Sequence, residues 1–136
     1  MTINRQLIGK KSLPQTFEVS LEAVRRFMEA IGDPFFHQDG TVIQYAPPTF
    51  PTSFNVQVPG LELDGSKMQL LHREQEYTYT RRLRIGEQVT CVVQLVDVRE
   101  RTLRGDHMTF VVLETTGVDS EHHPIFTVRS TLVIRE

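Results

Sequence analysis

The chain has 136 residues, of which 39% are hydrophobic and 24% are charged, and this balance predicts one soluble domain spanning residues 1–136. A formal net charge of -2 gives no broad basic field, so nucleic acid and anionic membranes are not expected partners. The only cysteine, Cys91, excludes an intrachain disulfide, and no segment is apolar for long enough to span a membrane or to act as a secretory leader. We therefore expect a cytoplasmic protein.

The first predicted elements are a short strand within Leu13–Val19 and an amphipathic helix after it. Ser20 can accept a hydrogen bond from a first-turn amide, and Gly32 can end the helix in the left-handed conformation. The apolar residues between them recur at helical spacing: Leu21, Val24, Phe27, Met28 and Ile31. We expect this helix to pack one side against a flat surface.

Helical periodicity is lost after Gly32, where five prolines occur before Gly65. Pro51 suits the first turn of a helix, so a second short helix is predicted over Thr52–Val58, followed by an exposed loop over Pro59–Met68. We expect any chemistry of the chain to reside in this polar, proline-rich connection.

The second half of the chain changes to a period of two, which is typical of β-strands. The predicted strands are Gln75–Leu83, Val89–Leu95, Met108–Thr116 and Ile125–Ile134, and the turns are Ile85–Glu87, Arg101–Asp106 and Val118–His123. Strands joined by short turns predict an antiparallel meander, and the preceding helix needs its apolar face covered. The predicted fold class is α+β, a hot-dog fold in which a long curved antiparallel sheet wraps around a helix.

Several sequence blocks then match one known family. They are Gly9, AIGDP at residues 30–34, APPTF at 46–50, LHREQEYTY at 71–79, Gly86-Glu87 and VRSTLVIR at 128–135. Together these blocks, which extend over nearly the whole chain, resemble the MaoC-like dehydratase N-terminal domain family. The combination of the APPTF block with the downstream LHREQEYTY block is the specific part of the match.

This resemblance implies a hot-dog fold that pairs with a second one, so that acyl chains attached to CoA or acyl carrier protein enter between the helices. It also implies (R)-specific hydration of trans-2-enoyl thioesters, or dehydration of (3R)-hydroxyacyl thioesters. In the two-subunit enzymes of this superfamily, the N-terminal-type half mainly holds substrate and the hydratase-type half carries the catalytic Asp and His. The expected partner is a second copy or a hydratase-type subunit.

The catalytic pattern of active relatives, G-D-x-N-P-[LIV]-H, places the histidine five residues after the aspartate. In this chain His37 lies only four residues after Asp33, and the asparagine is absent. One missing residue shifts a side chain by up to about 3 Å, which is a large error for a pair that must flank one water. Two interpretations therefore remain: Asp33 and His37 form a catalytic acid/base pair, or they are turn and loop residues.

Four residues are candidates for substrate binding. After two prolines, Thr49 is the first residue of the APPTF block with an amide N–H, so it is the candidate for polarising the thioester carbonyl. Phe50 and Tyr45 belong to the same region, and His72 is a candidate contact for a thioester or pantetheine group, or else a structural hydrogen bonder. The arginines at 81, 82 and 84 are candidates for CoA phosphates or an acidic carrier protein, with a solvated strand edge as the alternative.

No cofactor or metal is expected, because the chain has no Gly-rich phosphate loop and no paired-cysteine pattern, and His122-His123 lacks a carboxylate or cysteine at ligand spacing. Three functions remain open: a hydratase or dehydratase, a non-catalytic acyl-thioester-binding subunit, and a hot-dog thioesterase. The thioesterase is disfavoured because no carboxylate occurs between Pro51 and Val58.

Overall fold

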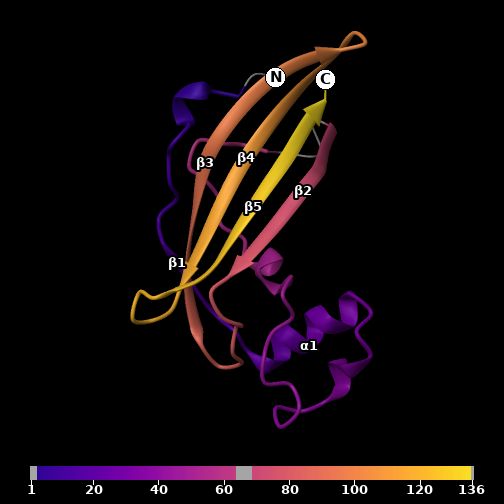
Figure 1. Cartoon of the computed structure of the whole chain (residues 1–136), viewed down its shortest axis with the longest axis vertical. Helices are drawn as coiled ribbons and strands as arrows, with labels where there is room; N and C mark the ends of the chain where they lie inside the picture. The colour runs from indigo at the N-terminus through magenta and orange to yellow at the C-terminus, as the bar shows by residue number, and fades with distance from the viewer. Residues whose placement is uncertain (1–2, 64–68, 136) are drawn as a thin grey trace.

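The computed structural model describes residues 3–63 and 69–135. Its elements in chain order are the 3-10 turn η1 (Arg5–Leu7), β1 (Gln15–Glu18), α1 (Leu21–Ala30), the 3-10 turns η2 (Pro34–His37) and η3 (Phe50–Ser53), β2 (Gln69–Tyr79), β3 (Gln88–Leu103), β4 (Asp106–Val118) and β5 (Pro124–Arg135). The strands form one antiparallel sheet in the order β1-β3-β4-β5-β2 (Figure 1). Among the described residues, no helix has the length and hydropathy that crossing a membrane requires.

The predicted antiparallel sheet is confirmed, and its strands are longer than the sequence pattern indicated. The predicted meander is right only for β3, β4 and β5, because β2 pairs with β5 at the sheet edge and not with β3, the next strand in the chain. β3 continues to Leu103 and β4 begins at Asp106, so the hairpin turn consists of Arg104 and Gly105, both with positive φ (52° and 82°) as such a turn requires. β2 begins at Gln69, before the predicted start, and ends at Tyr79. A register shift between His72 and Glu74 interrupts the alternation there, which explains why the pattern was not visible in the sequence.

The helix prediction is confirmed together with its signals. The Ser20 hydroxyl accepts a hydrogen bond from the Ala23 amide at 3.1 Å, and Gly32 has a φ of 80° just after the helix. α1 lies at one end of the sheet (Figure 1), and its buried residues are Val24 and Met28. The helix therefore covers one end of the sheet, and other segments cover the rest.

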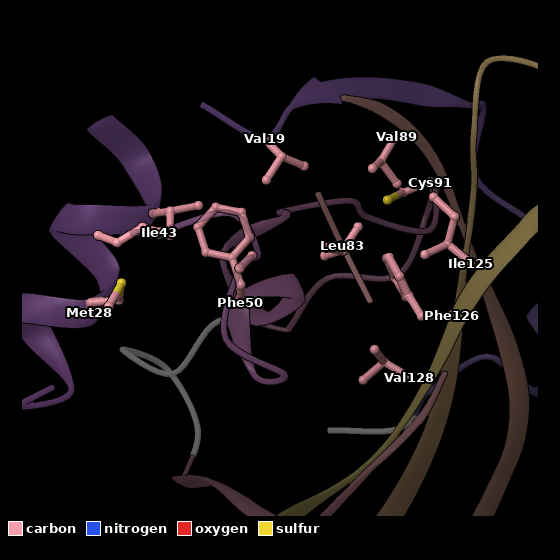
Figure 2. Close-up of a cluster of buried hydrophobic side chains, with 12 residues drawn as sticks. Val19, Met28, Ile43, Phe50, Leu83, Val89, Cys91, Ile125, Phe126 and Val128 are labelled. Carbon is pink, nitrogen blue, oxygen red and sulfur yellow. The ribbon is translucent and has the colours of Figure 1, made fainter. Parts of the chain in front are cut away.

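Two apolar clusters line the inner face of the sheet, which we define as the face carrying Cys91, Val93 and Leu95. The first cluster joins α1 to the sheet, and Phe50 lies between Met28 of the helix and Phe126 of β5 (Figure 2). Cys91 belongs to this cluster and is fully buried, and burial raises the pKa of its thiol to about 12. The predicted role of Cys91 as a core residue is confirmed.

The second cluster covers the other end of the inner face, and it includes residues from the N-terminal segment, from residues 56–63 and from β3, β4 and β5: Ile3, Val58, Val93, Leu95, Val98, Val111, Leu132 and Ile134. Because both clusters lie on one face, the opposite face of the sheet has no covering layer in the described structure.

The second helix, predicted over Thr52–Val58, is wrong. Only the single 3-10 turn η3 forms, and after it the exposure of the chain alternates, with Val56 and Val58 toward the sheet and Asn55 and Gln57 toward solvent. Two β-branched valines at a spacing of two suit extended chain better than a helix. The loop predicted over Pro59–Met68 has no regular structure up to residue 63, and residues 64–68 lie outside the described residues.

Candidate functional site

The proline-rich connection forms a pocket of about 650 Å³ between α1, η2 and the start of the APPTF block. Its lining is mainly apolar, with one acid and one base: Met28, Asp33, Phe35, Val42, Ile43, Gln44, Tyr45, Ala46, Pro47, Pro48 and Arg82. Phe35 and Val42 are 59% and 58% exposed, which is unusual for large apolar side chains gathered in one hollow. This pocket is the candidate site of the chain.

Asp33 lines the pocket but also has a structural role. Its amide donates to the Met28 carbonyl at 2.8 Å, and its Oδ1 accepts from the Phe35 amide at 3.0 Å, which caps η2. The two bonds attach η2 directly to the end of α1. The carboxylate is therefore held at the pocket wall by its own turn.

His37 does not line this pocket. It is exposed at the end of η2, where its Nε2 lies 3.4 Å from the Gln38 side-chain nitrogen and its ring meets the edge of Phe36. Asp33 precedes η2 as its N-cap residue with an extended backbone, whereas His37 is the last residue of the turn. The two residues therefore lie at opposite ends of η2, and only Asp33 belongs to the pocket lining.

Arg25 of α1 fixes the backbone of η2. Its Nε donates to the Phe36 carbonyl at 2.8 Å and its Nη2 to the His37 carbonyl at 3.3 Å. Asp39, two residues after His37, closes a local turn, and the bonds from the Thr41 hydroxyl and amide hold its pKa below the ordinary value. Asp39 is exposed and outside the pocket lining, so its bonds serve the loop.

Tyr45 also lines the pocket. Its backbone forms an isolated antiparallel bridge with Arg84, and the adjacent Ala46 amide donates to the Leu83 carbonyl at 2.9 Å. The Arg82 guanidinium lies 4.2 Å from the centroid of the Tyr45 ring, a cation–π contact. Arg82 is therefore part of the pocket lining and is also exposed to solvent.

The APPTF block is attached to the sheet through Tyr79, whose hydroxyl donates to the Pro48 carbonyl at 2.5 Å. Burial raises the pKa of Tyr79, so the phenol stays protonated and remains a donor at neutral pH. Thr49 follows as an exposed residue at the start of η3, next to the pocket lining. Phe50, by contrast, is 2% exposed and packs against Phe27 and Phe54 in the core behind the pocket.

His72 lies apart from the pocket. It is exposed on β2 opposite Leu132, and Tyr79 lies opposite Phe126, six residues away on β5, which corresponds to about 20 Å along a strand. The structure therefore brings Asp33, Tyr45 and the APPTF block together, and it does not bring His37 or His72 to them.

A polar network on β2 was not predicted. The Gln75 side chain donates to the Tyr77 hydroxyl at 2.7 Å, and that hydroxyl lies 2.5 Å from Thr52 Oγ1 of η3. The period-two pattern placed Gln75, Tyr77 and Tyr79 on one face, but their bonds to residues 48 and 52 depend on contacts distant in the sequence. Tyr77 and Tyr79 therefore pack against the core and also hold the polar connection in place.

The connection between β2 and β3 contains an ion-pair network. Arg81 donates two bonds to the Glu87 carboxylate, at 2.9 and 2.6 Å, and lies 3.6 Å from Asp119. Burial favours a higher pKa for Glu87, but the bonds from Arg81 and from the Arg84 amide outweigh it, so the pKa lies below its ordinary value. Arg81 is therefore already paired with acidic side chains of its own chain.

Among the described residues, no cluster of three or more His, Cys, Asp or Glu has a metal-binding arrangement.

Residues 6–128 match the family model described as FAS1-like, dehydratase domain region. The chain belongs to this family. It is 31% identical to a UPF0336 protein of Thermobifida fusca, with 99% of this chain and 95% of the relative covered. It is 32% identical to a UPF0336 protein of Saccharopolyspora erythraea, with coverages of 99% and 93%.

Several solved structures with low sequence identity to this chain share its fold. The HadBC (3R-hydroxyacyl-ACP dehydratase) complex of Mycobacterium tuberculosis aligns with a TM-score of 0.70 at 17% identity, covering 93% of this chain and 96% of that one. The ChsH1-ChsH2 complex of the same organism gives 0.66 at 17% identity, with coverages of 90% and 83%. A MaoC-like dehydratase of Rhodospirillum rubrum gives 0.65 at 11% identity, with coverages of 93% and 91%. The α+β hot-dog fold and the MaoC-like resemblance are confirmed.

Proposed function

We propose that this chain is the substrate-holding subunit of a two-subunit hydratase or dehydratase that acts on trans-2-enoyl or (3R)-hydroxyacyl thioesters of CoA or acyl carrier protein. The observation that carries the proposal is the separation of the two candidate catalytic residues, because His37 lies outside the apolar pocket that Asp33 lines. A single chain with this geometry can bind an acyl thioester but does not place an acid and a base on one water.

In this proposal the pocket binds the thioester through its two kinds of lining. The exposed apolar side chains of Phe35 and Val42 contact the acyl portion, and burying them on binding removes apolar area from water. Arg82, above the Tyr45 ring, is placed to meet the anionic phosphate of the carrier group. The amide and hydroxyl of Thr49 face the carbonyl from the adjacent turn.

The partner in this proposal is a hydratase-type hot-dog subunit, or a second copy of the chain. HadBC and ChsH1-ChsH2, which share this fold, were solved as complexes, and this supports a dimer. β2 ends the sheet on one side and is 11 residues long, so it leaves a row of backbone groups for pairing with another strand. We propose that the assembly functions in the cytoplasm, as the composition indicated.

A second candidate function is (R)-specific hydration by this chain without a separate catalytic subunit. It is favoured by the position of Asp33 in the wall of the pocket, where its carboxylate would activate a water. His37 would then act as the proton-transfer partner, from the same chain after rearrangement or from a second copy.

The proposal is tested with crotonyl-CoA and longer trans-2-enoyl-CoAs, incubated with the chain alone and with a co-expressed hydratase-type subunit. We expect binding without turnover for the chain alone, and turnover when the second subunit is present. Turnover by the chain alone that disappears in His37→Ala would overturn the holding role and establish the second candidate. Release of free CoA would identify a thioesterase instead.

A matched pair of variants tests the pocket itself. Val42→Asp introduces a charge at the pocket, and Leu103→Asp introduces the same charge at a similarly exposed position in the β3–β4 hairpin (58% and 52%). Because the apolar lining is proposed to contact the acyl chain, Val42→Asp should weaken acyl-CoA binding and Leu103→Asp should not. Equal effects of the two substitutions would refute this pocket as the binding site.

A further inference from the structure

The outer face of the sheet, opposite the two apolar clusters, contains a shallow basin of about 290 Å³. Four arginines line this basin, Arg73, Arg99, Arg101 and Arg129, and among the described residues its only acidic lining residue is Asp97. The chain as a whole has a formal charge of -2, so the basin is a local excess of positive charge on an otherwise slightly acidic protein.

Two irregularities in the strands border the arginine basin. The register of β2 shifts between His72 and Glu74, which makes Arg73 an extra residue in the strand, and the register of β3 shifts between Leu95 and Asp97. Such bulges change the direction of side chains. Arg73 is directed over the ring of Phe110 on β4, with its guanidinium carbon 5.3 Å from the centroid.

Only half of the positive charge in the arginine basin is balanced within the fold. Arg99 bonds to Asp97 at 2.7 Å, and Arg129 lies 3.6 Å from Glu114. Within residues 3–63 and 69–135, Arg73 and Arg101 have no carboxylate partner at ion-pair distance. These two guanidinium groups are therefore available to an anionic partner.

We propose that the arginine basin docks an acidic amphipathic helix of a partner protein. All four arginines of the basin are exposed, so it suits a surface contact better than an enclosed ligand. Arg101 lies on β3 and Arg73 on β2, the strands on either side of β4 and β5, so the two unbalanced charges flank the part of the sheet that a helix would cover.

The floor of the basin fits the same partner. Phe110 and Val112 are half-buried on the outer face and offer apolar contact between the arginines. A sheet face is stably covered by a helix that turns an apolar stripe toward it. Acidic residues on both sides of such a stripe would pair with Arg73 and Arg101.

The test uses a fluorescein-labelled 20-residue helical peptide with glutamates four residues apart on both sides of a leucine stripe, and a second peptide with glutamine in place of glutamate. Fluorescence anisotropy measures the binding of each. We expect the glutamate peptide to bind, the glutamine peptide to bind at least tenfold more weakly, and added salt to weaken the complex. A wild-type chain that does not bind the glutamate peptide overturns the proposal.

Variants then locate the contact. Arg73→Gln with Arg101→Gln removes the two unbalanced charges and no ion pair among the described residues, although it removes the contact of Arg73 with Phe110. It should raise the Kd at least tenfold while the variant still unfolds in one cooperative thermal transition. The control, Lys10→Gln with Arg26→Gln, removes the same net charge from exposed positions outside the basin and should change the Kd less than twofold.

Three results would overturn the proposal, and the first two would assign the basin to another occupant. Displacement of the peptide by an equimolar amount of inorganic triphosphate would identify a small-anion site. Salt-sensitive self-association that Arg73→Gln with Arg101→Gln abolishes would identify a second copy of this chain. Equal effects of the basin and control variants would show that the peptide responds only to overall charge.

Discussion

Gly117 on β4 has a position that only glycine fits, and Gly117→Ala tests the packing of the core beside the pocket. A Cβ atom at this position would lie 2.3 Å from two ring atoms of Phe126 on the paired strand and 2.8 Å from a third. Phe126 is 2% exposed and its ring packs against Phe54 and Tyr79, so the ring has little room to move.

The expected cost is an overpacking cost of about 1–3 kcal/mol in the free energy of unfolding. Replacing glycine by alanine also restricts the unfolded chain, which stabilises a protein by about 0.4–1 kcal/mol where the new side chain fits. At Gly117 the side chain does not fit, since 2.3 Å is far inside van der Waals contact, and the steric cost exceeds the entropic gain.

Urea denaturation measures this difference, and Gly40→Ala is the matched control. At Gly40 the nearest atom to an added Cβ is Leu21 Cδ2 at 3.6 Å, and the backbone has no positive φ. We expect a lower urea midpoint with an unchanged m value for Gly117→Ala, and a midpoint near or above that of the wild type for Gly40→Ala. If both variants are as stable as the wild type, the close approach of Phe126 to β4 is refuted.

Three further predictions concern single side chains. Thr109→Val should leave the free energy of unfolding unchanged or raise it by about 1 kcal/mol in urea denaturation, because the fully buried Thr109 hydroxyl has no hydrogen-bond partner among the described residues. A clear decrease in the free energy of unfolding would show that the hydroxyl has a partner. Glu87→Gln should cost about 1–3 kcal/mol and weaken the pH dependence of unfolding. Since the folded pKa of Glu87 is lowered, its contribution is present above the ordinary carboxyl pKa of about 4.3 and is lost as pH falls through the lower folded pKa; an unchanged acid slope in the variant would contradict this. Tyr79→Phe should lower the free energy of unfolding by about 0.5–1.5 kcal/mol and raise the acyl-CoA Kd, since it removes the hydrogen bond to the Pro48 carbonyl that positions the APPTF block. A wild-type Kd in calorimetric titration would show that this hydrogen bond does not contribute to binding.

Local patterns in the sequence were sufficient to predict the regular elements. Ser20 and Gly32 mark the ends of α1, and period-two alternation identifies the strands, because capping and alternation depend on residues only a few positions apart. The APPTF and LHREQEYTY blocks indicated the correct family for the same reason, since each is a contiguous string of residues.

Contacts between distant residues decided the rest, and these have no local signature. Residues 54–58 become extended because Val56 and Val58 pack on the sheet, although Pro51 suits the start of a helix. Arg73 reaches Phe110 because a register shift, visible only in the paired strands, changes its direction.

The sequence by itself therefore determined the fold class, the ends of the helix and the region of the candidate site. Only the tertiary structure decided that Asp33 lines the pocket as the cap of η2 while His37 is outside the lining, that Phe50 belongs to the core, and that Arg82 lies against Tyr45. The physical reason is that spacing along the chain determines only the direction of a side chain within its own helix, turn or strand. The packing of α1, the proline-rich connection and the sheet determines which side chains come into contact.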